Sequence, residues 1–217
     1  MTLTTPPVDR LAALGPAIGV PTWSDTQLAA LEQYAVWLTT EAVVRGGIGP
    51  SEGARIWDRH ILDSLVFAIG LAPGSTVLDV GTGVGLPGIL LAIAQPDLHV
   101  TLLDRAGRRI DGLHRILSIL DIDVTVEHAD VRNYSGTFDR VVLRASLPIA
   151  DALSQVPPLT GSAGEIWFGL GRGTDSKAMN AWHTAPAPLP ESWSAELVTI
   201  PDGVLDSPSW LLRIGRW

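Results

Sequence analysis

The sequence has 217 residues, of which 46% are hydrophobic and 18% charged, a composition that fits a globular protein and excludes an intrinsically disordered one. It contains no cysteine, which excludes disulfide bonds, a thiolate metal site and a cysteine nucleophile. The net charge of −8 argues against a polynucleotide partner unless basic residues gather in one place.

The longest apolar run, residues 86–94, is interrupted by Pro87 and is too short to cross a bilayer. The N-terminal segment MTLTTPPVDR lacks the basic start and apolar core of a secretory signal. We therefore expect a cytoplasmic monomer that contacts no membrane and holds no metal ion.

The N-terminal part of the sequence carries helical patterns. Ser24 and Gln27 have the spacing of a capping box, and apolar residues follow them at helical intervals. A glycine-rich break at residues 46–50 separates this helix from a second one, which begins near Ser51. The second helix is expected to bury Ile56, Trp57, Ile61, Leu65 and Ile69. We predict an N-terminal helical extension over residues 1–72.

From residue 73 onward, strand and helix patterns alternate with short loops between them. The predicted strands are residues 76–80, 99–103, 123–128, 138–143, 165–170, 195–200 and 210–214. Residues 105–120 place apolar side chains on one helical face. This alternation predicts a doubly wound α/β domain over residues 73–217, with a mostly parallel, seven-stranded sheet. The last two strands are expected to end the sheet as an antiparallel hairpin.

A glycine-rich loop joins the first predicted strand to an apolar helix. Its pattern is D-x-G-x-G-x-G from Asp79 to Gly85, and such glycines let a ligand approach the backbone. Dinucleotide-binding proteins use G-x-G-x-x-G instead, and here Leu86 stands where that pattern needs its third glycine. Asp79 would repel a pyrophosphate but attract the cationic amino-acid end of a sulfonium cofactor. The arrangement resembles motif I of the class I S-adenosylmethionine-dependent methyltransferases.

Acidic residues also stand at the ends of the second and third predicted strands. Asp104 can accept both hydroxyls of a ribose, or it can cap the helix over residues 105–120. Asp130 follows the third strand, where class I methyltransferases border the adenine, so it is either an adenine contact or an exposed turn residue. Both are candidates for contacts with the nucleoside half of the ligand.

Four segments together resemble the RsmG family, also called glucose-inhibited division protein B, the 16S ribosomal RNA guanine-N7 methyltransferases. They are WDRHILDSL at 57–65, DVGTGVGLPG at 79–88, LLD at 102–104 and RA at 144–145. The stretch from Gly49 to Ser64 is especially similar to actinobacterial members. The resemblance implies a class I methyltransferase (Rossmann-like) fold, S-adenosyl-L-methionine as cofactor, and the 16S ribosomal RNA of the small ribosomal subunit as partner.

The resemblance also implies roles for individual residues. The cofactor-binding set, including the residues that shape the loop, is Asp79, Gly81, Thr82, Gly83, Gly85, Leu86, Asp104, Ala129, Asp130 and Arg144. Arg144 matches the family's arginine at the edge where cofactor and target base meet, so its expected role in catalysis is positioning. Arg59 and His60 can meet Asp63 and Ser64, four residues later, and form a polar row with them. This row either docks the helix on the core, or closes the cofactor pocket or positions RNA.

Guanine N7 chemistry fits the lack of an evident general base. The N7 lone pair is nucleophilic without deprotonation, so the enzyme need supply only proximity and alignment. Arg105 and Arg109 belong to a basic cluster that is either a solvated helix face or a contact for RNA. Arg172 is a further substrate candidate, close to where the family has a lysine, and Leu143 stands in place of the family's serine.

Other functions remain open at this point. A divergent relative would keep the cofactor but methylate a small molecule or another RNA, and a non-catalytic binding protein could have the same fold. A nicotinamide-dependent oxidoreductase is disfavoured by the glycine spacing and by Asp79.

Overall fold

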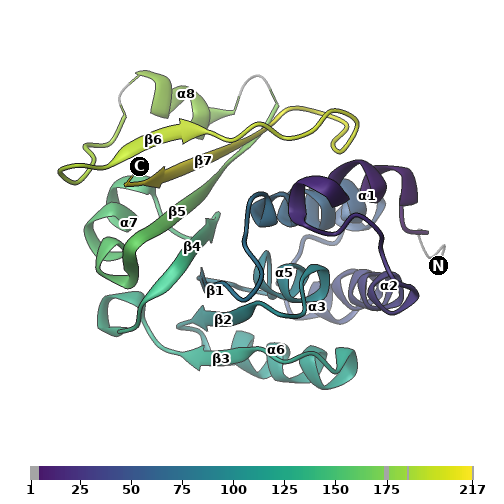
Figure 1. Cartoon of the computed structure of the whole chain (residues 1–217). Coiled ribbons are helices and arrows are strands. Elements are labelled where there is room, and N and C mark those ends of the chain that lie inside the picture. The colour runs from purple at the N-terminus through teal and green to yellow at the C-terminus, as the bar shows by residue number, and fades with distance from the viewer. Residues whose placement is uncertain (1–4, 174–175, 185, 217) are drawn as a thin grey trace.

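Strands form where apolar and β-branched residues follow one another between glycine, proline and aspartate. The computed structural model describes residues 5–173, 176–184 and 186–216, and it contains all seven predicted strands. They are β1 (Thr76–Val80), β2 (His99–Asp104), β3 (Thr125–His128), β4 (Phe138–Arg144), β5 (Thr160–Arg172), β6 (Ser194–Leu197) and β7 (Ser209–Gly215). They form one sheet in the order β3-β2-β1-β4-β5-β7-β6 (Figure 1).

The strands β3, β2, β1, β4 and β5 run parallel, and β7 pairs antiparallel with both β5 and β6. The antiparallel end of the sheet is confirmed, with β7 lying between β5 and β6. In β1, Asp79 stands opposite Leu102 of β2 and Val142 of β4. The strand order reverses between β1 and β4, and ligands of open α/β sheets bind outside the carboxyl ends of the strands at such a point.

Both faces of the sheet are buried, because successive side chains of each strand enter different hydrophobic clusters. Val77 and Val142 belong to the cluster on one face, whereas Leu78 and Val141 belong to the cluster on the other. The first cluster includes α5 (Gly88–Ala94) and α6 (Gly107–Leu120). The second includes α7 (Ile149–Gln155) and α8 (Lys177–Thr184). The doubly wound arrangement is therefore confirmed.

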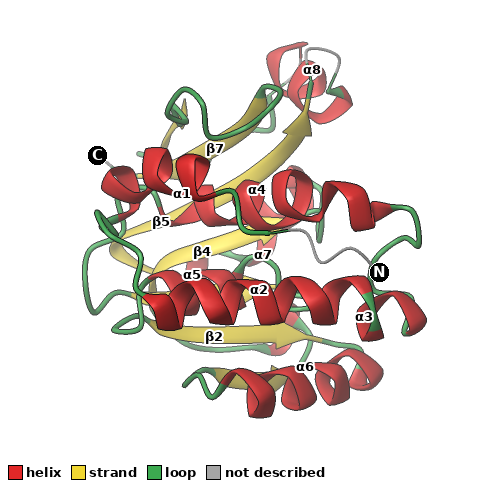
Figure 2. Ribbon diagram, turned by 90° about the vertical axis from the view of Figure 1, so that its right-hand side faces the viewer, coloured by secondary structure: helices red, strands yellow, loops and turns green. Residues whose placement is uncertain are grey.

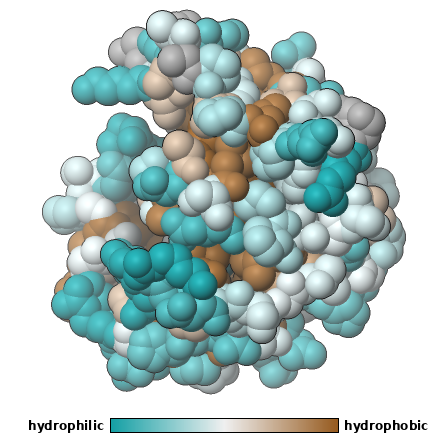
Figure 3. All heavy atoms as spheres, turned by 90° about the vertical axis from the view of Figure 1, so that its left-hand side faces the viewer, coloured by the Kyte–Doolittle hydropathy of each residue, from teal (hydrophilic) through white to brown (hydrophobic). Residues whose placement is uncertain are grey.

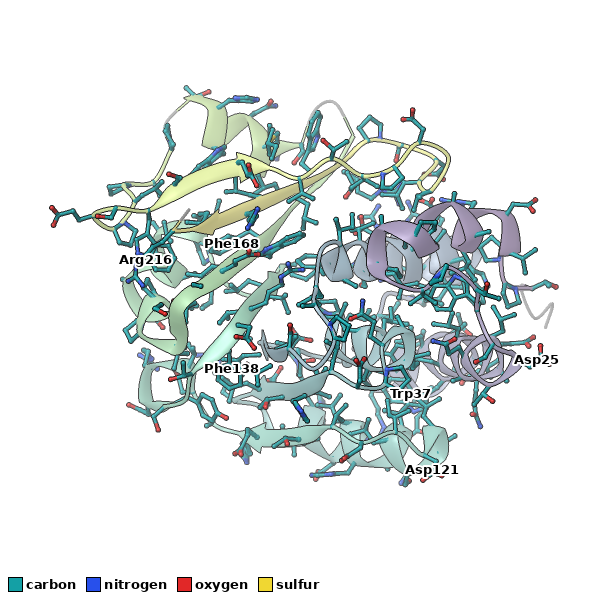
Figure 4. The ribbon with its side chains drawn as sticks, in the orientation of Figure 1. Asp25, Trp37, Asp121, Phe138, Phe168 and Arg216 are labelled. Atoms are coloured by element: carbon teal, nitrogen blue, oxygen red, sulfur yellow. The ribbon has the colours of Figure 1, made fainter. Side chains whose placement is uncertain are left out.

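Helices that precede β1 cover the same face as α5 (Figure 2). They begin with α1 (Val8–Leu14), η1 (Gly15–Ile18), α2 (Asp25–Thr39) and α3 (Glu41–Val44). The predicted capping box is confirmed by reciprocal hydrogen bonds between Ser24 and Gln27. Asp25 at the start of α2 is exposed, whereas Trp37 is buried toward α6 (Figure 4). Because these helices share one cluster with β1, the division after residue 72 stays a prediction.

The second predicted helix is a series of short turns of different pitch. They are η2 (Glu52–Arg55), the π-helix η3 (Ile56–Leu62), α4 (Asp63–Leu65) and η4 (Val66–Ala68). Ile56, Trp57, Ile61 and Leu65 are buried as predicted, and Ile69 is half-buried beyond the last turn.

The π-helix changes which side chains face the same way, because its hydrogen bonds span five residues instead of four. The expected contacts of Arg59 with Asp63 and of His60 with Ser64 do not form among the described residues. Arg59 and His60 instead bind Glu52, at 3.5 and 3.1 Å, and the buried hydroxyl of Ser64 has no hydrogen-bond partner there.

The helix α6 begins at Gly107, two positions later than predicted, and Ala106 is its N-cap, so Arg105 lies outside it. Two short 3-10 turns, η5 (Val131–Asn133) and η6 (Pro157–Leu159), complete the described elements. Within the described ranges, no helix is both long and apolar enough to cross a membrane, and no three histidine, aspartate or glutamate side chains gather as a metal site would need.

Candidate functional site

The glycine loop after β1 is held by the side chain of Asp79. Its Oδ2 atom accepts hydrogen bonds from the Thr82 hydroxyl at 2.6 Å and from the Gly88 N–H at 2.8 Å. The N–H groups of Gly81 and Thr82 donate to the Leu103 carbonyl at 2.8 and 3.1 Å, which docks the loop on β2. Asp79 and Thr82 therefore fix the shape of the loop.

The second carboxylate oxygen of Asp79 is in a different situation. Asp79 is only 1% exposed, and its Oδ1 atom has no hydrogen-bond partner among the described residues. Burial raises the pKa of Asp79 to about 6, against the lowering effect of the hydrogen bonds from Thr82 and Gly88 and of the Arg144 charge. A buried acceptor left unpaired is costly, so a cationic or N–H donor that reached it would be stabilised.

The three glycines of the loop have different surroundings. A Cβ atom on Gly81 would lie 2.6 Å from the Cβ of Ser146, and one on Gly85 would lie 2.3 Å from Cδ1 of Ile89. A Cβ atom on Gly83 would meet nothing nearer than the Gly81 carbonyl oxygen, at 3.9 Å. Neighbouring protein atoms thus explain two of these glycines, whereas Gly83 faces open space. Leu86, next in the chain, is buried at 5% exposure.

A cavity of about 470 Å³ opens at the carboxyl edge of the sheet, beside this loop. The strands β2 and β3 run toward that side, on the left of Figure 1, and the face is hollowed there in Figure 3. Six of the predicted site residues line the cavity: Gly81, Asp104, Arg105, Arg109, Ala129 and Asp130. The residues that line it come from the ends of β1 and β2, from the segments that follow β3 and β4, and from α6 and α7.

Asp104, the last residue of β2, is buried at 2% exposure. Its Oδ2 atom accepts hydrogen bonds from the Gly83 N–H at 3.0 Å and from Arg109 Nη1 at 3.2 Å. Its Oδ1 atom accepts one from the Ala106 N–H at 2.9 Å, at the N-cap of α6. Asp104 thus joins the glycine loop to the start of α6. It contacts the N-terminal end of α6 and at the same time forms part of the cavity wall.

Asp130, after β3, is paired with Arg132. Its Oδ1 atom accepts hydrogen bonds from the N–H of Arg132 at 3.0 Å and from Nε at 2.9 Å, and Oδ2 accepts one from Nη2 at 2.7 Å. The hydrogen bonds from the Arg132 side chain and backbone hold the pKa of Asp130 well below its usual range. Asp130 is therefore a carboxylate at neutral pH and can accept an N–H donor from a ligand.

Arg144, the last residue of β4, points toward η3 and is not part of the cavity lining. Its Nη2 atom donates a hydrogen bond to the Arg59 carbonyl at 2.8 Å and lies 3.5 Å from Oδ2 of Asp63. Burial lowers the pKa of His60, and the Arg144 charge lowers it further, although Glu52 opposes both. His60 is therefore neutral at pH 7.

Arg172, the last residue of β5, lies in a network of carboxylates on the inner side of η3. It forms ion pairs with Asp58, with Asp63 at 4.0 Å and with Asp206 at 2.6 Å. Asp58 also pairs with Arg10 of α1. Asp58 and Asp63 are five residues apart, and the π-helix lets both contact the same guanidinium. Asp58 and Asp63 thus contact the protein core, whereas Arg59 is 53% exposed and pairs with Glu52. The role of the polar row and a substrate contact by Arg172 stay predictions.

Part of the cavity wall was not predicted from the sequence: Arg132, Ala145, Ser146, Asp151 and Gln155. Ala145 has a φ of 55°, which turns the chain at the end of β4 and brings Ser146 against Gly81. The position of this pair directly after a parallel strand was the signal available, because such positions border the ligand crevice. Nothing in the sequence marks the α7 side chains.

Comparison with known proteins identifies the family. The family model of GidB, rRNA small subunit methyltransferase G, matches residues 27–180. The chain belongs to the GidB family. The ribosomal RNA small subunit methyltransferase G of Mycobacterium sp. (strain KMS) is 43% identical to this GidB-family chain over 124 residues, 55% of each protein. That of Salinispora tropica is 40% identical over 157 residues, 72% of this chain and 57% of that protein.

The chain spans little more than half the length of these curated GidB-family relatives. Among solved structures, the ribosomal protein L11 methylase from Lactobacillus delbrueckii subsp. bulgaricus has a TM-score of 0.52 with 18% sequence identity, over 71% of this chain and 77% of that one. This likeness concerns the fold. The predicted family and the predicted fold class are both confirmed.

Proposed function

We propose that this chain is an S-adenosyl-L-methionine-dependent methyltransferase that acts on N7 of a guanine in the 16S ribosomal RNA of the small ribosomal subunit. The observation that carries the proposal is the GidB-family match over residues 27–180, because that range contains the glycine loop and every predicted residue that lines the cavity. The family description, rRNA small subunit methyltransferase G, supports the class of acceptor. Guanine N7 follows from the sequence resemblance.

The residues present suit this cofactor. The cavity of about 470 Å³ falls within the range of small-ligand sites, roughly 300–1,000 Å³. Asp104 and Asp130 border it as carboxylates suited to a ribose hydroxyl and to an adenine amino group. The unpaired Oδ1 atom of Asp79 suits a cationic donor, and the open space at Gly83 suits close approach to the backbone.

The chain's own residues would act by binding and alignment. When bound, the cofactor supplies a methyl group on a positively charged sulfur. Guanine N7 presents a lone pair that needs no deprotonation, so alignment accounts for the rate and no general base is required. This fits the cavity wall, whose described residues include no histidine.

Arg144 is the residue that we propose aligns the reacting groups. Its charge lowers the pKa of Asp79 and of His60, so it is within electrostatic reach of the glycine loop and of η3. The Arg59 carbonyl and the Asp63 carboxylate hold the guanidinium in place. Arg144→Lys keeps the charge but loses the planar donor set, so it is expected to lower methyl transfer while the affinity for S-adenosylhomocysteine stays the same.

The test begins with titration calorimetry of S-adenosylhomocysteine against the full chain. Small ribosomal subunits from cells that lack N7 methylation are then incubated with the protein and S-adenosylmethionine, and the modified nucleoside is identified by mass spectrometry. Arg115→Ala, on the outer part of α6, serves as the control for Arg144→Lys. No binding at millimolar S-adenosylhomocysteine, or no methyl transfer to the subunits, would overturn the proposal. The expected monomer is tested by light scattering of the same sample.

A further inference from the structure

Two arginines at the rim of the cavity form ion pairs with Asp104 and Asp130, the two carboxylates proposed to bind the nucleoside part of the cofactor. Arg109 contacts Asp104 at 3.2 Å, and Arg132 contacts Asp130 at 2.7 Å. These guanidiniums are far from buried, since their side chains are 56% and 64% exposed. Arg105 is a third exposed arginine in the cavity wall, and it forms no ion pair with a described residue. A protein of net charge −8 thus concentrates three cations at one opening.

The hydrogen bonds at Asp104 leave too few acceptor positions for a ribose. An ionised carboxylate offers about four lone-pair positions, two on each oxygen. Oδ2 already accepts from Gly83 and Arg109, and Oδ1 accepts from Ala106. One position remains, whereas a ribose diol brings two hydroxyl donors. One of the three present donors must therefore leave for both hydroxyls to bind.

Arg109 is the donor that can leave. The other two donors are backbone N–H groups, one in the glycine loop and one at the N-cap of α6, and they cannot move without changing the fold. Arg109 sits on a flexible side chain that is 56% exposed, so water can solvate its guanidinium once it leaves the buried Asp104. At Asp130 no such conflict arises, because Oδ2 accepts a single hydrogen bond and keeps one position for an amino donor.

We propose that Arg109 exchanges partners during the reaction cycle: the cofactor's ribose displaces it from Asp104, and the freed guanidinium binds a backbone phosphate of the RNA. This inference rests on the proposed function. Before the exchange, the Arg109 charge is neutralised by a buried carboxylate. After it, the neutral hydroxyls occupy Asp104, and Arg109 joins Arg105, which has no ion pair with a described residue, as a cation available to a phosphate; Arg132 stays paired with Asp130.

The exchange couples the two ligands. Because cofactor binding supplies one of the RNA contacts, RNA binds more tightly to the cofactor-loaded protein than to the free protein, and the reverse holds equally. The protein would therefore favour cofactor first and RNA second, and it would not hold ribosomal RNA that it cannot methylate.

The first experiment uses S-adenosylhomocysteine without RNA, and it compares Arg109→Ala with Arg115→Ala. Arg115 is a matched control, since it lies on the same helix, is 63% exposed and pairs with Glu41 away from the cavity. Removing the competitor is expected to leave the affinity unchanged or to raise it up to about 5-fold, whereas the control stays at the wild-type value. A clear loss of affinity in Arg109→Ala would overturn the proposal, because Arg109 would then be a cofactor ligand.

The second experiment measures binding to small ribosomal subunits with and without S-adenosylhomocysteine. Wild type and Arg115→Ala are expected to bind about 5-fold or more tightly with it, and Arg109→Ala is expected to lose this gain. With S-adenosylhomocysteine present, the slope of the logarithm of the binding constant against the logarithm of the salt concentration should be shallower in Arg109→Ala than in wild type, by about the amount due to one phosphate contact. An equal gain in Arg109→Ala and wild type would overturn the proposal. The two proposals can fail separately, because the first experiment involves no RNA and no methyl transfer.

Discussion

Alanine substitutions at Gly83 and Gly85 test two different reasons for glycine in the same loop, which are packing against neighbouring side chains and access for the cofactor. Gly85 has a φ of +98°, and a Cβ atom there would lie 2.3 Å from Cδ1 of Ile89 and 3.0 Å from the Tyr34 hydroxyl. A positive φ costs a non-glycine residue about 1–2 kcal/mol, and forcing a methyl group into a packed core adds about 1–3 kcal/mol. Gly85→Ala is therefore expected to lower the free energy of unfolding by about 2–5 kcal/mol.

Gly83→Ala is the matched variant. Gly83 has a φ of +64° but no atom within contact distance of the added methyl group, so the loss of stability should stay near about 1–2 kcal/mol. Its methyl group would instead stand in the open space where the cofactor is proposed to approach. We expect the affinity for S-adenosylhomocysteine to fall about 10-fold or more, a loss of about 1.4 kcal/mol.

Urea denaturation followed by circular dichroism measures the first quantity, and titration calorimetry measures the second. Thermal melts give an independent check, since each kcal/mol lowers Tm by about 2–4 °C in a chain of this size. Equal losses of stability in the two variants would refute the reasoning, because the contacts with Ile89 and Tyr34 would then have no consequence. An unchanged ligand affinity in Gly83→Ala would remove that residue from the site.

Three further predictions concern charged side chains. Burial raises the pKa of Asp79 in the folded protein to about 6, above an unfolded value of about 3.9. The free energy of unfolding should therefore fall by about 3 kcal/mol as the pH rises from about 3.9 to about 6. Asp79→Asn should abolish this pH dependence in urea titrations from about pH 3 to about pH 7. Burial alone would raise the pKa of Asp58, but its hydrogen bonds from Asp206, Arg172 and Arg10 hold it well below its usual range. Asp58→Asn should therefore cost about 1–3 kcal/mol at pH 7 and progressively less below pH 4, and a pH-independent cost would contradict this. Arg140 is 4% exposed and donates hydrogen bonds to the Phe67 and Ile69 carbonyls and to Glu165. Arg140→Met should therefore lower the free energy of unfolding by about 3–5 kcal/mol, whereas the exposed control Arg115→Ala should lower it by less than about 1 kcal/mol. Similar losses in the two variants would contradict the structural role of Arg140.

Much of the fold could be predicted because its strands are short apolar runs between turn residues. The bounds of β1 agree with the prediction at both ends, since Thr76–Val80 is mostly apolar, with Gly74 and Ser75 before it and Gly81 after it. The strand β5 begins at Thr160 instead of residue 165. Its first part contains Gly161 and Gly164, and a Cβ atom on Gly164 would lie 2.7 Å from the Phe138 carbonyl. Glycine weakens the strand pattern in the sequence, while the close approach of β4 requires it.

The site residues that could be predicted are those whose role follows from their place at the carboxyl end of a strand. Asp104 ends one parallel strand and Asp130 closely follows the next, and both border the cavity. The partners of the charged residues were not predictable, because they depend on tertiary placement: Arg172 meets Asp58, which lies 114 positions earlier. The helical pattern near Asp58 also did not distinguish an α-helix from a π-helix, since Ile56, Trp57, Ile61 and Leu65 are buried here as predicted for an α-helix.

The carboxylate of Asp58 has a consequence for where the protein can be divided. It is 13% exposed, and its partners include Arg10 in α1 and the N–H of Asp206 between β6 and β7. Both partners lie outside residues 27–180, the segment that carries the family's sequence signature. A chain trimmed to that segment would leave a nearly buried charge without two of its partners and would expose the edge of β5 that β7 covers. We therefore expect the unit that folds by itself to be larger than the recognisable part of the sequence and to include both α1 and β7.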